Sequence, residues 1–307
     1  MAFSGPDFKA TFDKQSGLLT SYLYKKHEYI LNGQGPRPFF WRAPTDNDYG
    51  ANLPVRLKAW KEASYQEPKA ESFQVTPGSN ATTIKVTYRF PQTDARWDIT
   101  YKIYASGVIK VDNRFVAEGD QAPMIPRVGL RMQLPESFTD LTYYGRGPKE
   151  NYRDRRTSQF IGEYAIPFKD MYEPYVRPQE NNHRTDIYWC ALTDKTQRGL
   201  LLIADRTFEL NASNYPLESM DSGDTIDNGA PRTEKTHHRH LTDPLPEKMV
   251  DLFIDYRMMG VGGDDSWGAT AHEPYLIRPG KENAIEYGFS LVPFDKKEDY
   301  KYLIRQY

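Results

Sequence analysis

Short segments in which apolar and polar residues alternate one by one recur along most of this chain, and they constrain its fold more than any other feature. They span residues 8–12, 18–24, 84–90, 97–103, 108–116, 128–134, 249–257 and 285–291. A period of two places every second side chain on one face of a β-strand. The 22 prolines are spread along the sequence and disfavour long helices. The pattern therefore predicts an all-β protein with many short strands.

The same strands decide the expected architecture and the number of domains. Many strands at short spacing, separated by turn signals, are typical of a large antiparallel β-sandwich. The continuous apolar run at 199–204 predicts a strand that is covered on both faces. A short helix is expected at 54–63, which begins with Pro54, and a helical turn at 236–240 would be a second one. Because no linker or internal repeat divides the sequence, we predict one domain over residues 1–307.

Composition excludes several classes of protein. With 38% hydrophobic and 27% charged residues, the chain has the composition of a globular protein with a large core. The net charge of −2 gives no electrostatic reason to expect nucleic acid or an anionic membrane as a partner. No apolar stretch approaches the roughly 20 residues of a membrane span. Residues 1–6 lack the charged leader of a signal peptide, and the chain starts almost within its first strand, as expected of an excised domain or a separately encoded subunit.

The single cysteine, Cys190, excludes an internal disulfide and a metal site built from cysteines. It lies in the apolar run 187–192 and is expected to be a buried small hydrophobic residue rather than a nucleophile. The chain contains no Gly-x-Ser-x-Gly elbow, phosphate-binding loop or dinucleotide fingerprint. Hydrolysis of a glycoside needs two facing carboxylates about 5–10 Å apart, a pair that a sequence alone does not reveal.

A glycine-rich segment at 260–267 follows a clear strand. Its three glycines allow backbone angles that other residues avoid, and Asp264, Asp265 and Ser266 can hydrogen-bond the backbone and fix a turn. The segment presents Trp267 at its end. Two interpretations follow: the indole offers a flat apolar surface to the C–H face of a sugar ring, or it closes the end of the sandwich core.

A second polar segment, residues 41–50, contains Asp46, Asn47 and Asp48 in succession. These three resemble half of a calcium-binding loop, but the glycine and the distal glutamate of an EF-hand are absent. The simpler interpretation is a loop that folds on its own Asp and Asn side chains. Gly50 would then act as a hinge for the residues that follow.

Charged and histidine-rich segments offer two further candidates. Asp154 lies among arginines in the segment 145–156, which predicts a salt-bridge cluster that fixes an irregular loop or a domain interface. Residues 236–240 hold three of the six histidines, without the i, i+4 spacing of a helical zinc site. On a strand His238 and His240 would share a face, but no third ligand is fixed nearby. We therefore expect a capped turn there rather than a metal site.

Five motifs follow one another along the chain: WRAPTDND at 41–48, GRGPxENYxDR at 145–155, DMYxPYxxPxEN at 170–181, HRH at 238–240 and GGDDSW at 262–267. Together they resemble the C-terminal small-chain domain (domain 5) of the large bacterial β-galactosidases, and the resemblance spans nearly the whole chain. It implies a galactose-mutarotase-like supersandwich packed against a TIM barrel. It also implies that barrel glutamates supply the acid/base and the nucleophile, so that no catalytic residue lies in this chain.

The resemblance also implies roles for the residues of the glycine-rich segment. Trp267 would reach into the active site of a retaining β-galactosidase and line its aglycone side, with Asp264, Asp265 and Ser266 as motif support. Alone the chain should be inactive on terminal β-galactosides, because a retaining mechanism needs both glutamates.

For the polar segment, the resemblance implies an active-site loop formed by Asp46, Asn47, Asp48 and Gly50 that moves between open and closed states on ligand binding. The partners implied are the barrel-containing remainder of the enzyme and a β-galactoside substrate. No cofactor or metal is implied in this chain. The parent enzyme is implied to use a divalent cation (Mg²⁺ or Ca²⁺), with Na⁺ as a further candidate.

Other functions fit parts of the same pattern. The chain can be the small subunit of a split, heteromeric β-galactosidase. A free-standing aldose 1-epimerase would need a histidine acid and a carboxylate base near the anomeric carbon, for which His183, His238 and Glu180 are the candidates. A carbohydrate-binding module without catalysis is a third alternative. The sequence leaves open whether the parent is cytoplasmic or periplasmic.

Overall fold

The protein folds into two antiparallel β-sheets. The computed structural model describes residues 1–117, 123–223, 240–265, 268–278, 280 and 284–306. The small sheet contains, in this order, β1 (Ala2–Ser4), β2 (Phe8–Phe12), β3 (Leu19–Tyr24) and β4 (His27–Glu28). The large sheet contains β5 (Arg37–Phe39), β6 (Ala70–Thr76), β7 (Ala81–Phe90), β8 (Ala95–Tyr104), β9 (Ile109–Ala117), β10 (Arg127–Pro135), β11 (Phe138–Gly147), β12 (Phe160–Pro167), β13 (Arg184–Asp194), β14 (Gly199–Ser213), β15 (Met249–Met258) and β16 (Ile285–Phe294).

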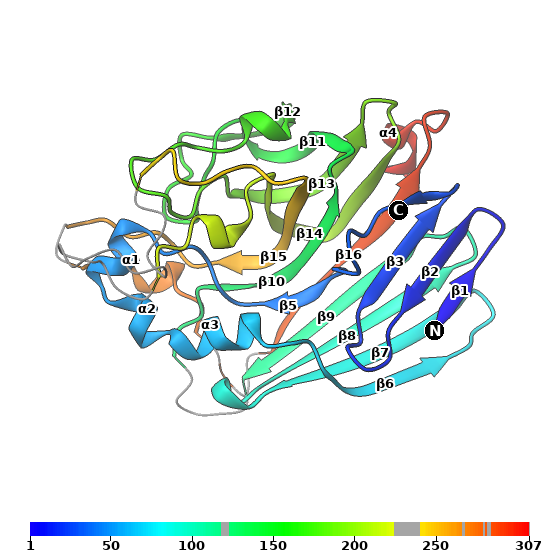
Figure 1. Cartoon of the computed structure of the whole chain (residues 1–307), viewed down its shortest axis with the longest axis horizontal. Coiled ribbons are helices and arrows are strands. Elements are labelled where there is room, and N and C mark those ends of the chain that lie inside the picture. Colours follow the sequence, from blue (N-terminus) through cyan, green and yellow to red (C-terminus); the bar gives the residue numbers. More distant parts are fainter. Residues whose placement is uncertain (118–122, 224–239, 266–267, 279, 281–283, 307) are drawn as a thin grey trace.

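One edge of the long strand β14 pairs with β13, which leads to β11 and β12, and its other edge is shared by two branches of the large sheet. The first residues of β14, 199–204, pair with β16, which leads to β9, β8, β7 and β6. Its last residues, 209–213, pair with β15, which leads to β10 and β5. Because one strand belongs to both branches, the sheet curls around its core and forms the antiparallel sandwich that the sequence predicts (Figure 1).

Large aromatic side chains fill the space between the branches. The ring of Phe40 lies 5.0 Å from Trp60, 4.9 Å from Phe90, 5.5 Å from Trp97 and 5.5 Å from Phe115, centroid to centroid. Edge-to-face and tilted pairs of this kind add to the stabilisation that burial of the rings provides. These five aromatic residues therefore belong to the hydrophobic core.

The apolar run at 199–204 is covered on both faces, as predicted. Leu200 and Leu202 belong to the main core, whereas Leu201 packs on the opposite face against a smaller cluster that α4 (Tyr300–Leu303) helps to cover. Cys190 is also fully buried, which confirms its expected role, and burial raises the pKa of its thiol.

The expected helix at 54–63 is present as two shorter helices, α2 (Leu53–Arg56) and α3 (Lys58–Tyr65). Two further α-helices occur among the described residues, α1 (Asp46–Gly50) and α4, so short helices are more numerous than the one or two predicted. The remaining helical turns are η1 (Pro91–Thr93), η2 (Phe168–Asp170), η3 (Leu217–Ser219) and η4 (Glu273–Tyr275). The predicted turn at 236–240 lies outside the described residues, apart from His240.

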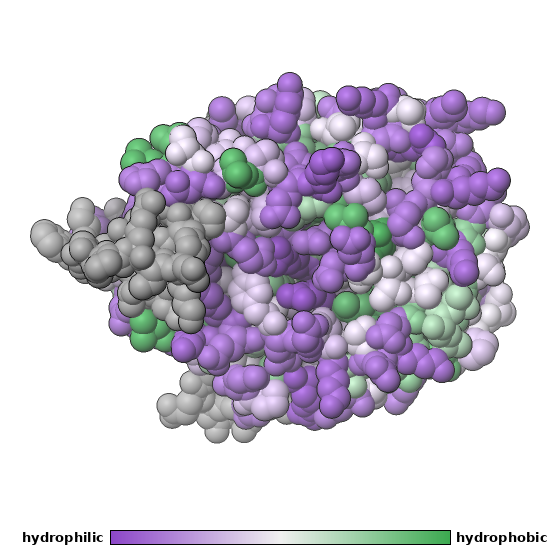
Figure 2. Space-filling view, viewed as in Figure 1, coloured by the Kyte–Doolittle hydropathy of each residue, from purple (hydrophilic) through white to green (hydrophobic). Residues whose placement is uncertain are grey.

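The surface is mostly polar, and apolar residues occur on it singly rather than in one large patch in the view of Figure 2. A groove of about 1140 Å³ crosses the outer face of β7, β8, β9 and β16, and we call it the sheet groove. Charged residues line it, among them Glu71, Arg89, Arg114 and Glu286. Helices α1, α2 and α3 lie at the opposite end of the molecule from β1 to β3 and the two termini (Figure 1).

Candidate functional site

Segments that are far apart in the sequence meet at the end of the molecule that carries α1 (Figure 1). They are residues 41–50, the turn at 150–156, and residues 258–265, which begin with the last residue of β15. Hydrogen bonds from the first two segments reach the backbone of the third. We call these three segments the α1 end. It includes parts of three of the five sequence motifs.

Helix α1 replaces the loop that was expected at Asp46, Asn47 and Asp48. Thr45 is its N-cap: the Thr45 hydroxyl accepts the N–H of Asp48 at 3.1 Å, and the Asp48 carboxylate accepts the N–H of Thr45 at 3.0 Å. This reciprocal capping box satisfies two N–H groups at the start of the helix. The Asp-rich segment therefore forms a helical turn with acidic residues at its N-terminus, where the helix dipole favours them.

The carboxylate of Asp48 also fixes Arg42 in the protein interior. Asp48 Oδ1 lies 2.7 Å from Nη2 of Arg42 and Oδ2 lies 2.9 Å from its Nε, and both residues are buried. The guanidinium donates further hydrogen bonds to the carbonyl of Met259 at 2.7 Å and to that of Gly260 at 3.1 Å. Arg42 thereby connects α1 to the two residues that follow β15.

The other predicted residues of this segment face outward or toward the glycine-rich segment. Asp46 is exposed and accepts a hydrogen bond from Gln179 Nε2 at 3.1 Å. Asn47 donates from Nδ2 to the carbonyl of Val261 at 3.0 Å. Gly50 ends α1 beside Gly268, and a Cβ on Gly50 would lie 3.4 Å from the Cα of Gly268. The structure thus brings Asn47 and Gly50 against the segment that the GGDDSW motif occupies.

Asp154 does not form the salt-bridge cluster that the sequence predicts. Its carboxylate accepts the backbone N–H groups of Val261 at 3.0 Å and Gly262 at 2.8 Å. The neighbouring arginines pair elsewhere: Arg153 with Glu209, Arg155 with Glu150 and Arg156 with Asp186. The expected function of fixing an irregular segment is thus fulfilled by a different contact, because the free N–H groups of a loop attract a carboxylate as arginine does.

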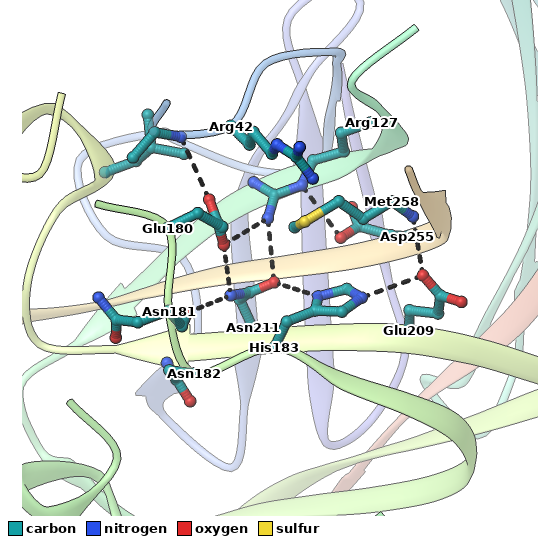
Figure 3. A network of polar contacts seen from close by, with 12 residues as sticks. Arg42, Arg127, Glu180, Asn181, Asn182, His183, Glu209, Asn211, Asp255 and Met258 are labelled. Atoms are coloured by element: carbon teal, nitrogen blue, oxygen red, sulfur yellow. Dashed lines mark hydrogen bonds and ion pairs between the residues drawn. The ribbon is translucent and has the colours of Figure 1, made fainter. Parts of the chain in front are cut away.

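A buried polar network lies beneath the α1 end (Figure 3). It contains Arg127, Glu180, His183, Glu209, Asn211 and Asp255, all at most 5% exposed. Arg127 Nη2 lies 3.2 Å from Glu180 Oε1 and 3.0 Å from Asn211 Oδ1. Glu180 also accepts the N–H of Ala43 at 3.2 Å, and Glu209 accepts the N–H of Met258 at 2.7 Å. The network therefore binds the backbone of two of the three segments of the α1 end, 41–50 and 258–265.

The hydrogen bonds of Asn211 fix the side-chain atom that it presents to His183. Asn211 donates from Nδ2 to Glu180 at 2.9 Å and to the carbonyl of Asn181 at 2.8 Å, so its Oδ1 must be the atom that faces His183. His183 Nδ1 lies 2.6 Å from that oxygen, and Nε2 lies 3.0 Å from the Glu209 carboxylate. Both ring nitrogens of His183 thus face oxygen atoms, and the ring is held between Glu209 and Asn211.

Asp255 is the least solvated carboxylate of this network. Burial raises its pKa to about 7, although Arg127 and His183 favour the charged form, and Glu209 and Glu180 add to the rise. Asp255 Oδ2 lies 3.2 Å from Nε of Arg127, yet neither carboxylate oxygen accepts a hydrogen bond from any residue that the structure describes. A carboxyl group in this position titrates near neutral pH, so the charge of the network changes there.

The aspartates of the GGDDSW motif are exposed and make short-range contacts. Asp264 hydrogen-bonds to His272 Nε2, and Asp265 Oδ1 accepts the N–H of Ala269 at 3.2 Å. Ser266 and Trp267 lie outside the described residues. Both interpretations of Trp267, as a contact for a sugar and as a residue that closes the core, therefore stay predictions from the sequence.

The candidate residues of the epimerase alternative do not form an open site. Glu180 and His183 are 4% and 1% exposed, and their polar atoms bind Arg127, Asn211 and Glu209. His238, the other candidate, lies outside the described residues. An acid and a base that act on a sugar must reach the substrate. This arrangement therefore favours a structural role for Glu180 and His183.

Sequence reasoning missed most of the buried polar network. No local pattern marks Arg127, Glu209 or Asp255 as members of a network, because their partners lie far away in the sequence. One signal was available: Asp251 and Asp255 lie among the apolar residues of 249–256 in β15, and a charge inside a covered strand requires a partner.

Among the described residues, no group of three or more His, Cys, Asp or Glu side chains is arranged to hold a metal ion. None of the helices in the described part of the chain is long and apolar enough to cross a membrane.

Comparison with solved structures identifies the class of fold. The chain is similar to galactose 1-epimerase from Lactobacillus acidophilus, with a TM-score of 0.53 and 7% identity over 96% of this chain and 93% of that one. It is also similar to part of a TPR-domain containing protein from Parabacteroides distasonis, with a TM-score of 0.52 and 12% identity over 97% of this chain and 47% of that one. The fold is thus a galactose-mutarotase-like sandwich, and at these identities the similarity concerns the fold alone.

Sequence comparison identifies the family. The family model described as "Beta galactosidase small chain" matches residues 4–291, so the chain belongs to this family. It is 34% identical to a β-galactosidase of Priestia megaterium over 90% of this chain and 25% of that protein. It is 32% identical to a β-galactosidase of Lactobacillus delbrueckii subsp. bulgaricus over 90% of this chain and 26% of that protein. The chain therefore spans about a quarter of the length of these relatives.

Proposed function

We propose that this chain is the C-terminal region, or a separately encoded small subunit, of a retaining β-galactosidase that hydrolyses terminal β-galactosides. The observation that carries the proposal is the family match over residues 4–291, together with relatives that are β-galactosidases about four times as long. The main partner of the chain is then the remainder of the same enzyme, which we expect to contain a TIM barrel. The substrate is a β-galactoside.

We assign the catalytic carboxylates to that remainder. A retaining glycosidase needs two carboxyl groups about 5–5.5 Å apart that both reach the sugar. The carboxylates that gather beneath the α1 end, Glu180, Glu209 and Asp255, are buried and bound to arginine, histidine or backbone groups. Their arrangement supports a role in holding segments in place. The divalent cation and the Na⁺ that the resemblance implies belong to the remainder in the same proposal.

We assign to this chain the completion of the active site through Trp267 and the α1 end. Trp267 supplies a flat apolar surface for the aglycone, and the GGDDSW segment that carries it is anchored to α1 and to the turn at 150–156. In the same proposal Asp46, Asn47, Asp48 and Gly50 form the active-site loop, in which Asp48 holds α1 from the protein interior through Arg42. Because Asp48 and Asn47 are bonded to their neighbours, any movement on ligand binding would involve α1 as a whole.

Kinetics of a Trp267→Ala variant in the assembled enzyme test this assignment. We expect KM for a nitrophenyl β-galactoside to rise and kcat/KM to fall about tenfold, the loss that about 1.4 kcal/mol of aromatic contact accounts for. Trp189→Ala is a matched control, because Trp189 is a half-buried tryptophan on β13 that packs against Tyr144 and Tyr300. Unchanged kinetics in Trp267→Ala, or an equal loss in both variants, would overturn the assigned role.

A further inference from the structure

The turn that carries Asp154 is rigid before it meets the glycine-rich segment. Two backbone hydrogen bonds between Tyr152 and Arg155, at 3.1 and 2.7 Å, close this turn. Tyr152 is buried, and its ring stacks on His183 with a centroid separation of 5.5 Å. On one side of Asp154, Arg153 pairs with the buried Glu209 at 2.8 Å. The Asp154 carboxylate is therefore held in place by structure that lies outside the segment it binds.

The contact between Asp154 and the glycine-rich segment consists of charge-assisted hydrogen bonds. The two carboxylate oxygens accept consecutive backbone N–H groups, those of Val261 at 3.0 Å and Gly262 at 2.8 Å. Such bonds are roughly twice as strong as bonds between neutral groups. They fix the direction of the chain at the point where it leaves β15 and enters the motif.

The glycines of this segment fit the same contact. A Cβ at position 260 would lie 2.5 Å from Oδ2 of Asp154 and 2.9 Å from the Cβ of Ala271, so Gly260 permits the close approach. Gly262 has φ +67°, a conformation that side chains disfavour. Gly260 thus leaves room for the carboxylate while its own N–H binds the carbonyl of Tyr275 at 2.8 Å, and Gly262 supplies one of the two N–H groups that Asp154 accepts.

Helix α1 contacts the chain on both sides of the GGDDSW motif, at Val261 and at Gly268. Gly268 has φ +99°, and a Cβ there would lie 2.4 Å from the carbonyl oxygen of Gly50. Asn47 binds the carbonyl of Val261 at 3.0 Å from the same helix. Asp154 and α1 therefore both bind the chain where the motif begins, and α1 also contacts it just after the motif, at Gly268.

We propose that Asp154 is a positioning residue of the β-galactosidase active site: it fixes the backbone at Val261 and Gly262, where the GGDDSW motif begins, and acts on the reaction only through that motif. This inference rests on the proposed function of the chain and deepens it. Asp154 contacts neither substrate nor the reacting atoms in this account. Its effect must therefore disappear when the segment loses the side chain through which it reaches the substrate.

A double-mutant cycle in the assembled enzyme tests the inference. We expect Asp154→Ala to lower kcat/KM for a nitrophenyl β-galactoside about tenfold, mainly through KM, because two charge-assisted hydrogen bonds are lost. Asp154→Asn keeps one acceptor oxygen and should lie between wild type and Asp154→Ala. In the Trp267→Ala background, Asp154→Ala should cost less than about twofold, since coupled residues are not additive.

Asp194→Ala is the matched control. Asp194 Oδ1 also accepts two backbone N–H groups, those of Thr196 at 2.7 Å and Arg198 at 3.0 Å, but in the turn between β13 and β14. It should leave kcat/KM unchanged in both backgrounds. If Asp154→Ala behaves like Asp194→Ala, or if its effect adds fully to that of Trp267→Ala, the inference is wrong. If Trp267→Ala alone has no effect, the proposed function fails first.

A second readout does not depend on activity. Hydrogen exchange of the peptide that covers residues 258–265 should become faster in Asp154→Ala, whereas peptides of β7 and β8 should exchange as in the wild type. If Asp154→Ala does not fold, Gly260→Ala examines the same contact from the opposite side, because its methyl group displaces the carboxylate. Unchanged exchange at 258–265 in the folded variant would contradict the inference.

Discussion

Ion pairs of similar length occur in opposite surroundings in two regions of this molecule. In the sheet groove, Arg89 Nε lies 3.1 Å from Glu71, and the side chains are 42% and 50% exposed. In the buried polar network, Arg127 lies 3.2 Å from Glu180 and 3.2 Å from Asp255, and none of the three side chains is more than 3% exposed. Distance alone thus does not distinguish the two regions, whereas contact with water does.

The comparison shows where the fold uses buried charge. Exposed pairs contribute about 0–1 kcal/mol each, because water and salt screen them. Buried pairs are costly to form and still more costly to break, so their presence needs a reason. In this molecule the buried charges bind backbone groups of segments that meet at the α1 end: Glu180 binds Ala43, and Glu209 binds Met258, the last residue of β15. The buried charges therefore help to hold these segments in one geometry.

The largest expected effect comes from breaking the centre of the buried polar network. Arg127→Ala leaves the carboxylates of Glu180 and Asp255 buried without their cation. We expect the free energy of unfolding to fall by about 3–5 kcal/mol. Urea unfolding of the chain, with Arg114→Ala in the sheet groove as the control, measures the difference. Equal losses in both variants would remove the distinction between the two regions.

The next effect is a dependence of stability on pH that belongs to Asp255. Its pKa is raised from 3.8 to about 7 by burial, so the folded protein keeps a proton that the unfolded chain releases between these values. The stability that this group contributes is complete below pH 3.8 and is lost as pH rises through about 7. Asp255→Asn lacks this titration.

Compared with Asp255→Asn, the wild type should therefore lose stability as pH rises from 4 to 7, by at most about 4 kcal/mol, since one pKa unit corresponds to about 1.4 kcal/mol. Urea unfolding of both proteins at several pH values measures this difference. A difference that stays constant with pH, or that changes in the opposite direction, would contradict the assignment of the shift to Asp255.

A smaller effect is expected where α1 binds the segment after β15. Arg42→Lys keeps the charge but cannot maintain both bonds to Asp48 and both bonds to Met259 and Gly260. We expect a loss of about 1–3 kcal/mol in the free energy of unfolding. Hydrogen exchange should accelerate at 258–265 more than elsewhere. A uniform acceleration over the whole chain would mean that Arg42 does not act locally.

The smallest effect is expected in the sheet groove. Arg89→Ala breaks the exposed pair with Glu71 and should change the free energy of unfolding by less than about 1 kcal/mol. High salt should remove most of that change, because screening acts on exposed charges. A loss as large as that of Arg127→Ala would show that exposure is the wrong basis for the comparison.

The regular part of the fold was predictable from the sequence, because alternation of two residues is a local property. Strands β7, β8, β10 and β16 lie where the pattern places them. Helix α1 was not expected, since three adjacent Asp and Asn residues are typical of a loop. Thr45 followed by Asp48 at N3 was the available sign, although a capping box more often has Glu or Gln there.

The candidate site was predictable only in part, for a physical reason. Asp154 could be recognised as a residue that fixes a loop, but its neighbours in sequence suggested arginine partners, and its actual partners lie more than a hundred residues away. The same holds for Arg127 with Asp255. Contacts between distant segments follow from the curl of the sheet, which no local pattern encodes.

The most direct test of the central claim is hydrolysis of a chromogenic β-galactoside by this chain alone and by the chain mixed with the barrel-containing part of its enzyme. The account predicts no activity for the chain alone and activity in the mixture, reduced by Trp267→Ala. Activity of the chain alone would contradict the claim that the catalytic carboxylates lie outside it. A mixture in which the barrel part is equally active with and without this chain would contradict the claim that it completes the active site.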